Sequence, residues 1–390
     1  MDNYTELISK LNDSDYNVRI NAAALIGQAI KDNKLTRISL HQINNHIHTK
    51  YSFSPYEPAM AAFLAWQAGN DVVGSVDHDS ICAAKELHEA SEMFNIAATS
   101  GIELRINMKN TPFYNKKLNC PDAEGIAYFC IHAIPKKYYD SCDSFLKPIR
   151  QERSNRNRLM VDKLNTYLPD ITIDYDRDII PVSKYYCGGT ITERHILYGL
   201  SKAIVEKTGK GNTLISYLNN TLKITVPPQI SELLLDVNNE HYLYDLLGLL
   251  KGYYLPLFYI LPGEKECPLL EEFFDFADSI NGISAYPYLG DVKDSPTMDK
   301  KPEAFEDSYL NELVEFLAEK KCKAITYMPP RNTKAQLLYL KSLCEKYGFM
   351  QISGVDVNSS RQKLNCDELN DPDFAHLYDS AFALVEHEKM

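Results

Sequence analysis

Two histidines separated by one residue mark the start of a candidate metal site. Residues 46–49 read His-Ile-His-Thr and follow an apolar-polar stretch at 42–45. Alternate residues of a β-strand share one face, so His46 and His48 would aim their imidazoles at the same point. Imidazole nitrogen is a common ligand for transition metals. A second β-like run ends in Val76-Asp77-His78-Asp79 and adds a further candidate ligand.

The elements that must position these histidines alternate along the chain. Helical stretches are predicted at 57–68, 80–94, 303–320 and 333–347, and Gly69 and Gly348 stand where two of them should stop. Seven strands are predicted, at 42–47, 72–77, 96–101, 126–132, 282–286, 323–327 and 350–355. Such alternation predicts parallel strands joined by crossover helices.

Most of the predicted strands reach a possible metal ligand or a tyrosine at or just past the carboxyl end. These candidates are His46, His48, His78, Glu103, His132, Tyr286 and Asp356. In a closed parallel barrel the carboxyl ends converge on one mouth, where active sites are built. The sixth strand ends at Tyr327-Met328 and supplies no obvious ligand.

The segments outside the alternation are predicted to be helical. Residues 1–38 form a helical N-terminal extension in which 11–26 resembles one HEAT-like hairpin, although a single repeat cannot bury its faces alone. Residues 146–274 form a mainly helical insertion that begins with a basic stretch, and 39–145 with 275–390 form the barrel. The arginines of that stretch are interpreted either as a solvated helix face or as phosphate ligands.

Composition limits the classes of protein to consider. No run of about 18 apolar residues exists, which argues against a membrane span. Nine cysteines without a Cys-x-x-Cys pair are typical of reduced thiols in the cytoplasm. A net charge of −12 argues against a broad surface for duplex nucleic acid, but it allows a local cationic pocket. The sequence does not define the oligomeric state.

Seven short motifs, in a fixed order, resemble the PHP (polymerase and histidinol phosphatase) family. They are His46-Ile47-His48-Thr49 with Ser52, Val76-Asp77-His78-Asp79-Ser80, Gly101-Ile102-Glu103, Ile131-His132-Ala133, Thr192-Glu193-Arg194-His195-Ile196, Ser284-Ala285-Tyr286-Pro287 and Gly354-Val355-Asp356-Val357-Asn358. The similarity covers most of the chain after residue 40 outside the insertion. It is greatest to the stand-alone phosphoesterase branch, which includes a 5′–3′ exoribonuclease and a nucleoside bisphosphate phosphatase.

This resemblance implies a distorted (β/α)7 TIM-like barrel and a cluster of one to three divalent metal ions, zinc, manganese or iron. His46, His48, Glu103 and Asp356 would hold the first ion, and Glu103 would bridge to a second ion held by His132. His78 would belong to a third position, and Tyr286 and Asn358 align with two further ligand positions. Arg194 or Arg153 would bind phosphate, and His195 would be a phosphate donor, a general acid or an added ligand.

The implied activity is hydrolysis of phosphate esters by metal-activated water, on a phosphorylated small molecule, a nucleotide or an oligonucleotide end. Three family ligand positions differ here: Phe53 stands where the family has Asp or His, and Tyr286 and Asn358 stand where it has His. Asp77, Asp79 or His195 could substitute. The alternative is a catalytically degenerate protein that keeps phosphate or metal binding as an interaction module. Hydrolysis is favoured because the ligand set for the first metal is complete.

Overall fold

The computed structural model describes residues 4–38, 40–291 and 304–390, and its centre is one seven-stranded sheet. The strands follow the sequence order: β1 (Gln42–Ile47), β2 (Asn70–His78), β3 (Ala97–Asn107), β4 (Ile126–His132), β5 (Ile283–Pro287), β6 (Ala324–Tyr327) and β7 (Met350–Ser353). A parallel bridge between Ile47 and Val357 brings the end of the sheet back to its first strand. The prediction of seven strands in a distorted, nearly closed barrel is confirmed.

The direction of β4 differs from the prediction. β4 runs antiparallel to both β3 and β5, whereas the other neighbouring pairs in the sheet are parallel. The described segment between β3 and β4 contains no helix, so the chain turns back beside β3 instead of crossing over. The carboxyl end of β4 therefore points away from the mouth that the other strands share.

Helices cover the outside of the barrel. They are α3 (Pro58–Gln67), α4 (Ala84–Met93), α10 (Leu270–Ser279), α11 (Leu310–Glu319), α12 (Lys334–Tyr347) and α13 (His376–Glu388). The predicted helix ends are confirmed, since the chain turns at Gly69 with φ 86° and at Gly348 with φ 77°. Outward side chains such as Leu104, Phe129 and Ile325 pack with Phe273 and Leu313 in the largest hydrophobic cluster. Parts of the predicted extension, barrel and 303–320 helix (residues 1–3, 39 and 292–303) lie outside the described residues.

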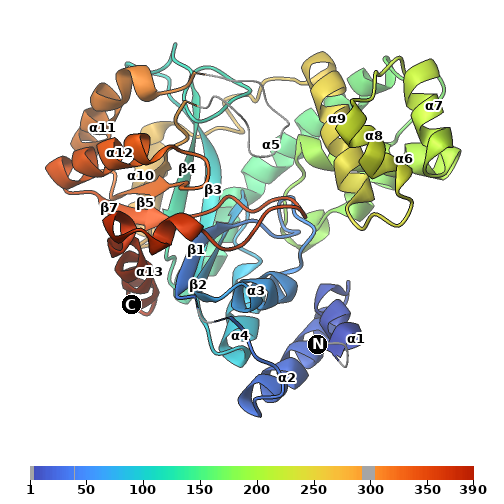
Figure 1. Cartoon of the computed structure of the whole chain (residues 1–390). Helices are drawn as coiled ribbons and strands as arrows, with labels where there is room; N and C mark the ends of the chain where they lie inside the picture. Colours follow the sequence, from blue (N-terminus) through green and yellow to red (C-terminus); the bar gives the residue numbers. More distant parts are fainter. Residues whose placement is uncertain (1–3, 39, 292–303) are drawn as a thin grey trace.

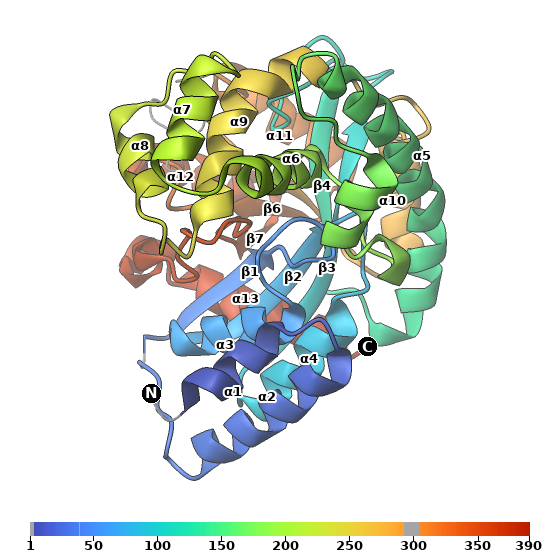
Figure 2. The same cartoon turned by 90° about the vertical axis from the view of Figure 1, so that its right-hand side faces the viewer.

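The N-terminal helices pack on the barrel helices. α1 (Thr5–Ser9) and α2 (Tyr16–Lys31) lie beside α3 and α4 (Figure 2). Asp15 caps α2 by accepting a hydrogen bond from the backbone N–H of Asn17. Arg19 on α2 is 2% exposed, and its Nε and Nη2 donate to the two carboxylate oxygens of Glu86 at 2.7 and 2.5 Å. This buried bidentate pair ties the extension to α4.

The segment between β4 and β5 is mainly helical. It contains α5 (Tyr139–Asn165), α6 (Glu193–Thr208), α7 (Asn212–Asn220), α8 (Pro228–Leu235) and α9 (Tyr242–Phe258), and α6–α9 form a separate group on the right of Figure 1. A second hydrophobic cluster, which includes Leu197, Leu200, Leu246 and Leu250, holds this group together. Among the described residues, no helix is both long and apolar enough to cross a membrane.

Candidate metal centre

The structure brings His46, His48, Glu103 and Asp356 together at the mouth of the barrel. Both histidines are about 1% exposed at the end of β1, and Asp356 follows β7. His48 Nε2 lies 3.1 Å from Asp356 Oδ1 and 3.7 Å from Glu103 Oε2, and His46 Nε2 lies 3.6 Å from Glu103 Oε1. Glu103 lies within β3, which extends to Asn107, rather than just past the end of a strand as predicted.

Glu103 separates two groups of possible ligands. Its Oε2 faces His48 and His78, with His78 Nδ1 at 2.9 Å, and its Oε1 faces His46 and the thiol of Cys130, with Sγ at 3.8 Å. In each of these groups, and in the group of His46, His48 and Asp356, the donor atoms lie within 4.8 Å of one another. Cys130 was not among the predicted ligands. The signal that could have revealed it is its position on the same face of β4 as His132.

His132 is not a member of any of these three groups. Because β4 runs antiparallel, His132 lies further from the mouth than Cys130, which pairs with Glu103 across β3 and β4. Its Nε2 is 3.3 Å from Thr326 Oγ1 inside the barrel. The predicted second metal position, held by Glu103 and His132, is therefore not the arrangement seen here.

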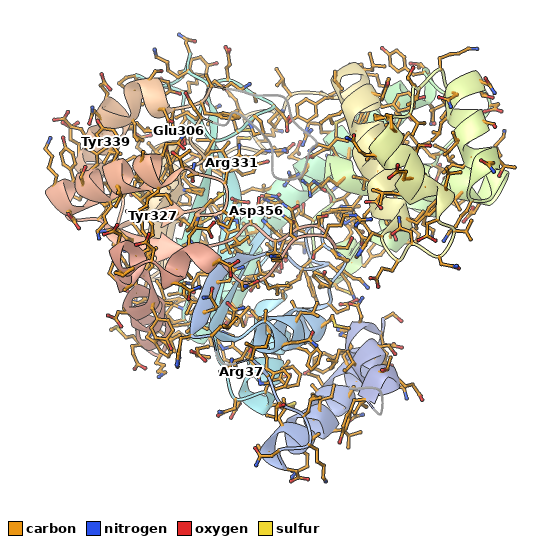
Figure 3. The ribbon with its side chains drawn as sticks, in the orientation of Figure 1. Arg37, Glu306, Tyr327, Arg331, Tyr339 and Asp356 are labelled. Atoms are coloured by element: carbon orange, nitrogen blue, oxygen red, sulfur yellow. The ribbon has the colours of Figure 1, made fainter. Side chains whose placement is uncertain are left out.

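Tyr286 points away from the centre, which contradicts its prediction as a ligand. On β5 its neighbour Ala285 pairs with Cys130 and takes the inward face, so Tyr286 must face outward. Its ring packs against Phe129, and its hydroxyl donates to Glu306 Oε1 at 3.4 Å. Glu306 lies toward α11 and α12, whereas Asp356 is near the middle of the molecule (Figure 3).

His195 also differs from its prediction as a phosphate donor, acid or ligand. It is 2% exposed at the first turn of α6, and its Nδ1 accepts the backbone N–H of Thr192 at 3.0 Å. Its ring packs edge-on against Phe53, with centroids 5.0 Å apart. His195 is thus a helix-capping residue, and Phe53 places an apolar ring beside it.

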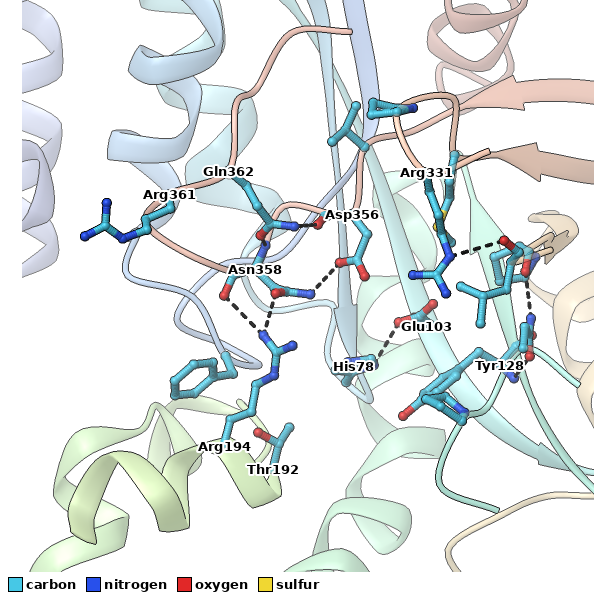
Figure 4. Close-up of a pocket in the computed structure, with 18 of the residues that line it drawn as sticks. His78, Glu103, Tyr128, Thr192, Arg194, Arg331, Asp356, Asn358, Arg361 and Gln362 are labelled. Carbon is cyan, nitrogen blue, oxygen red and sulfur yellow. Dashed lines mark hydrogen bonds and ion pairs between the residues drawn. The ribbon is translucent and has the colours of Figure 1, made fainter. Parts of the chain in front are cut away.

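Asn358 links Asp356 to Arg194 at the cavity wall. Its Nδ2 donates to Asp356 Oδ1 at 2.7 Å, and its Oδ1 accepts a hydrogen bond from Arg194 Nη1. The oxygen with which Asn358 would ligate a metal is thus engaged by the guanidinium. Figure 4 shows Arg194 projecting from the start of α6 toward this pair.

Asp356, Asn358 and Arg194 face a cavity of about 580 Å³ at the barrel mouth. Its wall includes Phe53, His78, Glu103, Asn119, Tyr128, Glu193, Arg194, Lys251, Arg331, Asp356, Asn358 and Arg361. The cavity lies between the barrel loops and the start of α6, which carries Arg194 (Figure 4), and Lys251 of α9 also lines it. Substrate could therefore contact both parts of the chain.

Three arginines and three carboxylates form a buried ion-pair cluster behind the wall that Glu193 lines. The members are Arg105, Arg153, Arg156, Asp79, Glu193 and Glu266. Glu266 accepts two hydrogen bonds from Arg156, each 2.6 Å long, and its Oε1 lies 3.3 Å from Arg105 Nη1.

This cluster corrects three predictions. Arg153 is 2% exposed and pairs with Asp79, so it does not present its guanidinium to the cavity as a phosphate ligand. For the same reason Asp79 does not substitute as a metal ligand. Both Arg153 and Arg156 are buried and therefore do not form a solvated helix face.

Asp77 supports the centre from behind instead of entering it. This carboxylate accepts hydrogen bonds from the backbone N–H and hydroxyl of Thr49 and from the hydroxyl of Ser52, each 2.6 Å long. The Ser52 oxygen in turn lies 3.2 Å from His48 Nδ1. This chain fixes the His48 ring and leaves its Nε2 directed at Asp356 and Glu103, the usual role of outer partners at metal sites.

Gly354 allows the last strand to approach the first. A Cβ at this position would lie 2.3 Å from the Cβ of His46. Any other residue would push β7 or His46 away. The glycine thus permits Asp356 to reach the histidine pair.

The electrostatics of the donor set fit a bound cation. Burial lowers the pKa of His46 and lowers that of His78 well below its usual value, which favours the neutral imidazoles that metal binding requires. Burial also acts to lower the pKa of His48, but the hydrogen bond and charge of Asp356 outweigh it and raise that pKa. Burial raises the pKa of Glu103 despite the nearby histidines. Both ring nitrogens of His46 are buried without a hydrogen-bond partner. A cation among these atoms would satisfy the nitrogens and compensate the carboxylate.

Comparisons with known proteins match the fold but not the sequence. No protein-family model and no curated protein matches the chain. A protein from Bifidobacterium adolescentis, provisionally described as a metal-dependent phosphoesterase, aligns with TM-score 0.56 and 15% identity over 89% of this chain and 96% of that chain. An amidohydrolase from Chromobacterium violaceum, with bound sulfate and no metal, aligns with TM-score 0.57 and 13% identity over 88% of this chain and 96% of that chain. At these identities the likeness shows a shared barrel fold.

Proposed function

We propose that this protein is a metal-dependent phosphoesterase of the PHP type. The observation that carries the proposal is the position of Glu103, whose two oxygens face separate donor groups beside a cavity at the barrel mouth. The fold shared with a protein described as a metal-dependent phosphoesterase supports it.

The chemistry would be divided between the ions and the chain. Divalent zinc, manganese or iron would offset charge on phosphoryl oxygens and lower the pKa of a bound water. His46, His48, Glu103 and Asp356 would hold the ions. Arg194 would orient the phosphate through charge-assisted hydrogen bonds, and Asn358 would hold Arg194 in place.

The substrate we propose is a phosphorylated small molecule, a nucleotide or an oligonucleotide end. A cavity of about 580 Å³ is within the usual range for small-molecule sites. The net charge of −12 would repel a long duplex, whereas a terminal phosphate would need only the local arginines. Phe53 and Tyr128 in the wall would shelter the reacting phosphate from bulk water.

The test is hydrolysis of phosphomonoesters and phosphodiesters by the full chain supplied with manganese, zinc or iron. Wild-type protein should release phosphate or alcohol, and the His48→Ala, Asp356→Ala double variant should fall to background. His41→Ala is the matched control, because this histidine is 78% exposed and lies outside the cavity wall. Its rate should equal that of the wild type.

A wild type as inert as the double variant, for every metal and ester class, would refute the proposal. Inert protein that still binds metal would instead support the degenerate binding module. The turned-away Tyr286 and the Arg194-bound Asn358 are consistent with that alternative, but neither removes a ligand of the first metal.

A further inference from the structure

The thiol of Cys130 lies inside the candidate centre. Cys130 is fully buried on β4, pairs with Glu103 across the strands and shares the inner face with Ala285. Its Sγ lies 3.8 Å from Glu103 Oε1 and belongs to one group with His46 and Glu103.

These distances fit a tetrahedral ion with one sulfur ligand. Zinc bonds of about 2.3 Å to sulfur and about 2.1 Å to nitrogen and oxygen imply separations of about 3.6 Å for sulfur to oxygen and about 3.4 Å for nitrogen to oxygen. The observed separations are 3.8 Å for Cys130 Sγ to Glu103 Oε1 and 3.6 Å for His46 Nε2 to the same oxygen. Shifts of about 0.2 Å would bring both of these separations to the values expected for zinc.

His46 supplies the second, independent observation. It is 1% exposed, and neither of its ring nitrogens has a hydrogen-bond partner. A buried polar atom without a partner is costly, so such an atom in a donor cluster indicates a missing ligand. The same Glu103 oxygen that faces His46 faces Cys130.

We propose that Cys130 is a metal ligand and completes one site with His46 and the Oε1 atom of Glu103. The sulfur would bind as thiolate, and its proton would leave to solvent as the metal enters. Cys130 thereby takes the place that the family resemblance gave to His132, because the antiparallel β4 presents Cys130 opposite Glu103. Since His46 faces Glu103 through Nε2 and one imidazole nitrogen binds one ion, His46 would serve the Cys130 site, and His48, Asp356 and the Oε2 atom of Glu103 would hold the other ion. A thiolate favours zinc, iron or cobalt over magnesium, calcium and manganese. The inference rests on the metal centre of the proposed function but not on the proposed reaction.

Cobalt and zinc give a direct readout of the sulfur bond. Full-length protein stripped by chelator is titrated with Co²⁺ under reducing conditions, and absorption is followed in the visible and near-ultraviolet regions. A sulfur-to-cobalt charge-transfer band should grow with the first equivalents. Zinc-loaded wild type should show one sulfur scatterer at about 2.3 Å in X-ray absorption spectra.

Matched variants show which cysteine provides the sulfur ligand. Cys130→Ser should abolish the charge-transfer band and the sulfur shell and weaken zinc binding by more than the roughly 10–100-fold cost of losing an outer-shell partner. Cys142→Ser, which alters another fully buried cysteine in the outer hydrophobic cluster, should change neither. If Cys130→Ser does not fold, Cys130→Ala takes its place, and the wild-type spectra remain decisive.

The outcomes separate this inference from the proposed function. Visible cobalt bands without a charge-transfer band, or a sulfur shell that survives in Cys130→Ser, would overturn the ligand role while leaving the metal centre intact. A sulfur shell in protein that hydrolyses no phosphate ester would support the ligand and refute the reaction. Absence of any bound metal would overturn both.

Discussion

Replacing Glu266 with glutamine should destabilise the protein more than most single substitutions do. Glu266 is 4% exposed and contacts Arg105, Arg153 and Arg156 with one carboxylate. The ion-pair cluster holds three arginines and three carboxylates, so Glu266→Gln leaves one buried positive charge without compensation. The amide keeps the shape of the side chain, and the effect therefore isolates the charge.

The expected loss is about 3–5 kcal/mol, the usual cost of removing one partner of a buried ion pair. An independent estimate agrees: two unit charges about 4 Å apart attract by about 4 kcal/mol at an effective dielectric constant of about 20. Glu264→Gln provides a control two residues away. Glu264 is 74% exposed and pairs with the half-exposed Lys109, so its loss should cost less than about 1 kcal/mol.

The effect should depend on pH in a defined direction. Burial raises the pKa of Glu266, but the hydrogen bonds and charge of Arg156, with the charges of Arg153 and Arg105, outweigh burial and lower it below 4.5. The stability that this carboxylate contributes is therefore present above about pH 4.5 and is lost as the pH falls through its folded-state pKa. The difference between wild type and variant should shrink on acidification.

Urea unfolding followed by far-ultraviolet circular dichroism measures the loss, with the fluorescence of Trp66 as a second probe. The Arg156→Gln, Glu266→Gln double variant should recover part of the stability, because it restores equal numbers of buried positive and negative charges. A loss below about 1 kcal/mol for Glu266→Gln at pH 7 would refute the reasoning. So would a double variant whose loss of stability equals the sum of the losses of the two single variants.

Three further predictions concern other parts of the molecule. Burial raises the pKa of Glu306 from 4.5 to about 7, so at about 1.36 kcal/mol per pH unit wild type should lose about 3 kcal/mol of stability between about pH 4.5 and 7. Glu306→Gln should remove that loss, and thermal melts across this range measure it. Asp77→Asn should weaken metal binding by roughly 10–100-fold, because Asp77 orients the His48 ring through Ser52. Competition with a chromophoric chelator measures the affinity, and an unchanged affinity would contradict this supporting role. Zinc at about 100 times its Kd should add about 2.7 kcal/mol to the stability of wild type but not of His48→Ala, Asp356→Ala, as read from melting curves.

The sequence predicts most of the barrel because its signals are local. Strand and helix alternation and the stops at Gly69 and Gly348 need no knowledge of tertiary contacts. The meeting of His46 and His48 follows from strand periodicity, and the approach of Asp356 follows from barrel closure. These predictions agree with the structure because each depends on a single strand or helix, or on the closure of the barrel.

The errors arise where the outcome depends on a neighbouring strand. Alternation predicts parallel strands, and nothing local in 126–132 reveals that β4 reverses, so His132 was expected at the mouth where Cys130 lies. Tyr286 was aligned with a family ligand, but its strand presents Ala285 to the interior. His195 stands beside Arg194 in the sequence, yet the two side chains point in different directions from the first turn of α6. Arg194 lines the cavity, whereas His195 accepts a hydrogen bond from the backbone N–H of Thr192 just before the helix.

The antiparallel direction of β4 also determines where the long helix α5 begins. β4 delivers the chain to the far side of the barrel, where Tyr139, at the start of α5, hydrogen-bonds to Glu388 of the last helix. The 27 residues of α5 then span about 40 Å and carry Arg153 and Arg156 up to the rim. The helix α5, which contains Pro148, therefore connects the end of the barrel opposite the mouth to the edge of the site, and its first residue contacts the C-terminal helix. Removing the last few residues would destabilise the start of α5 without removing any residue that lines the cavity.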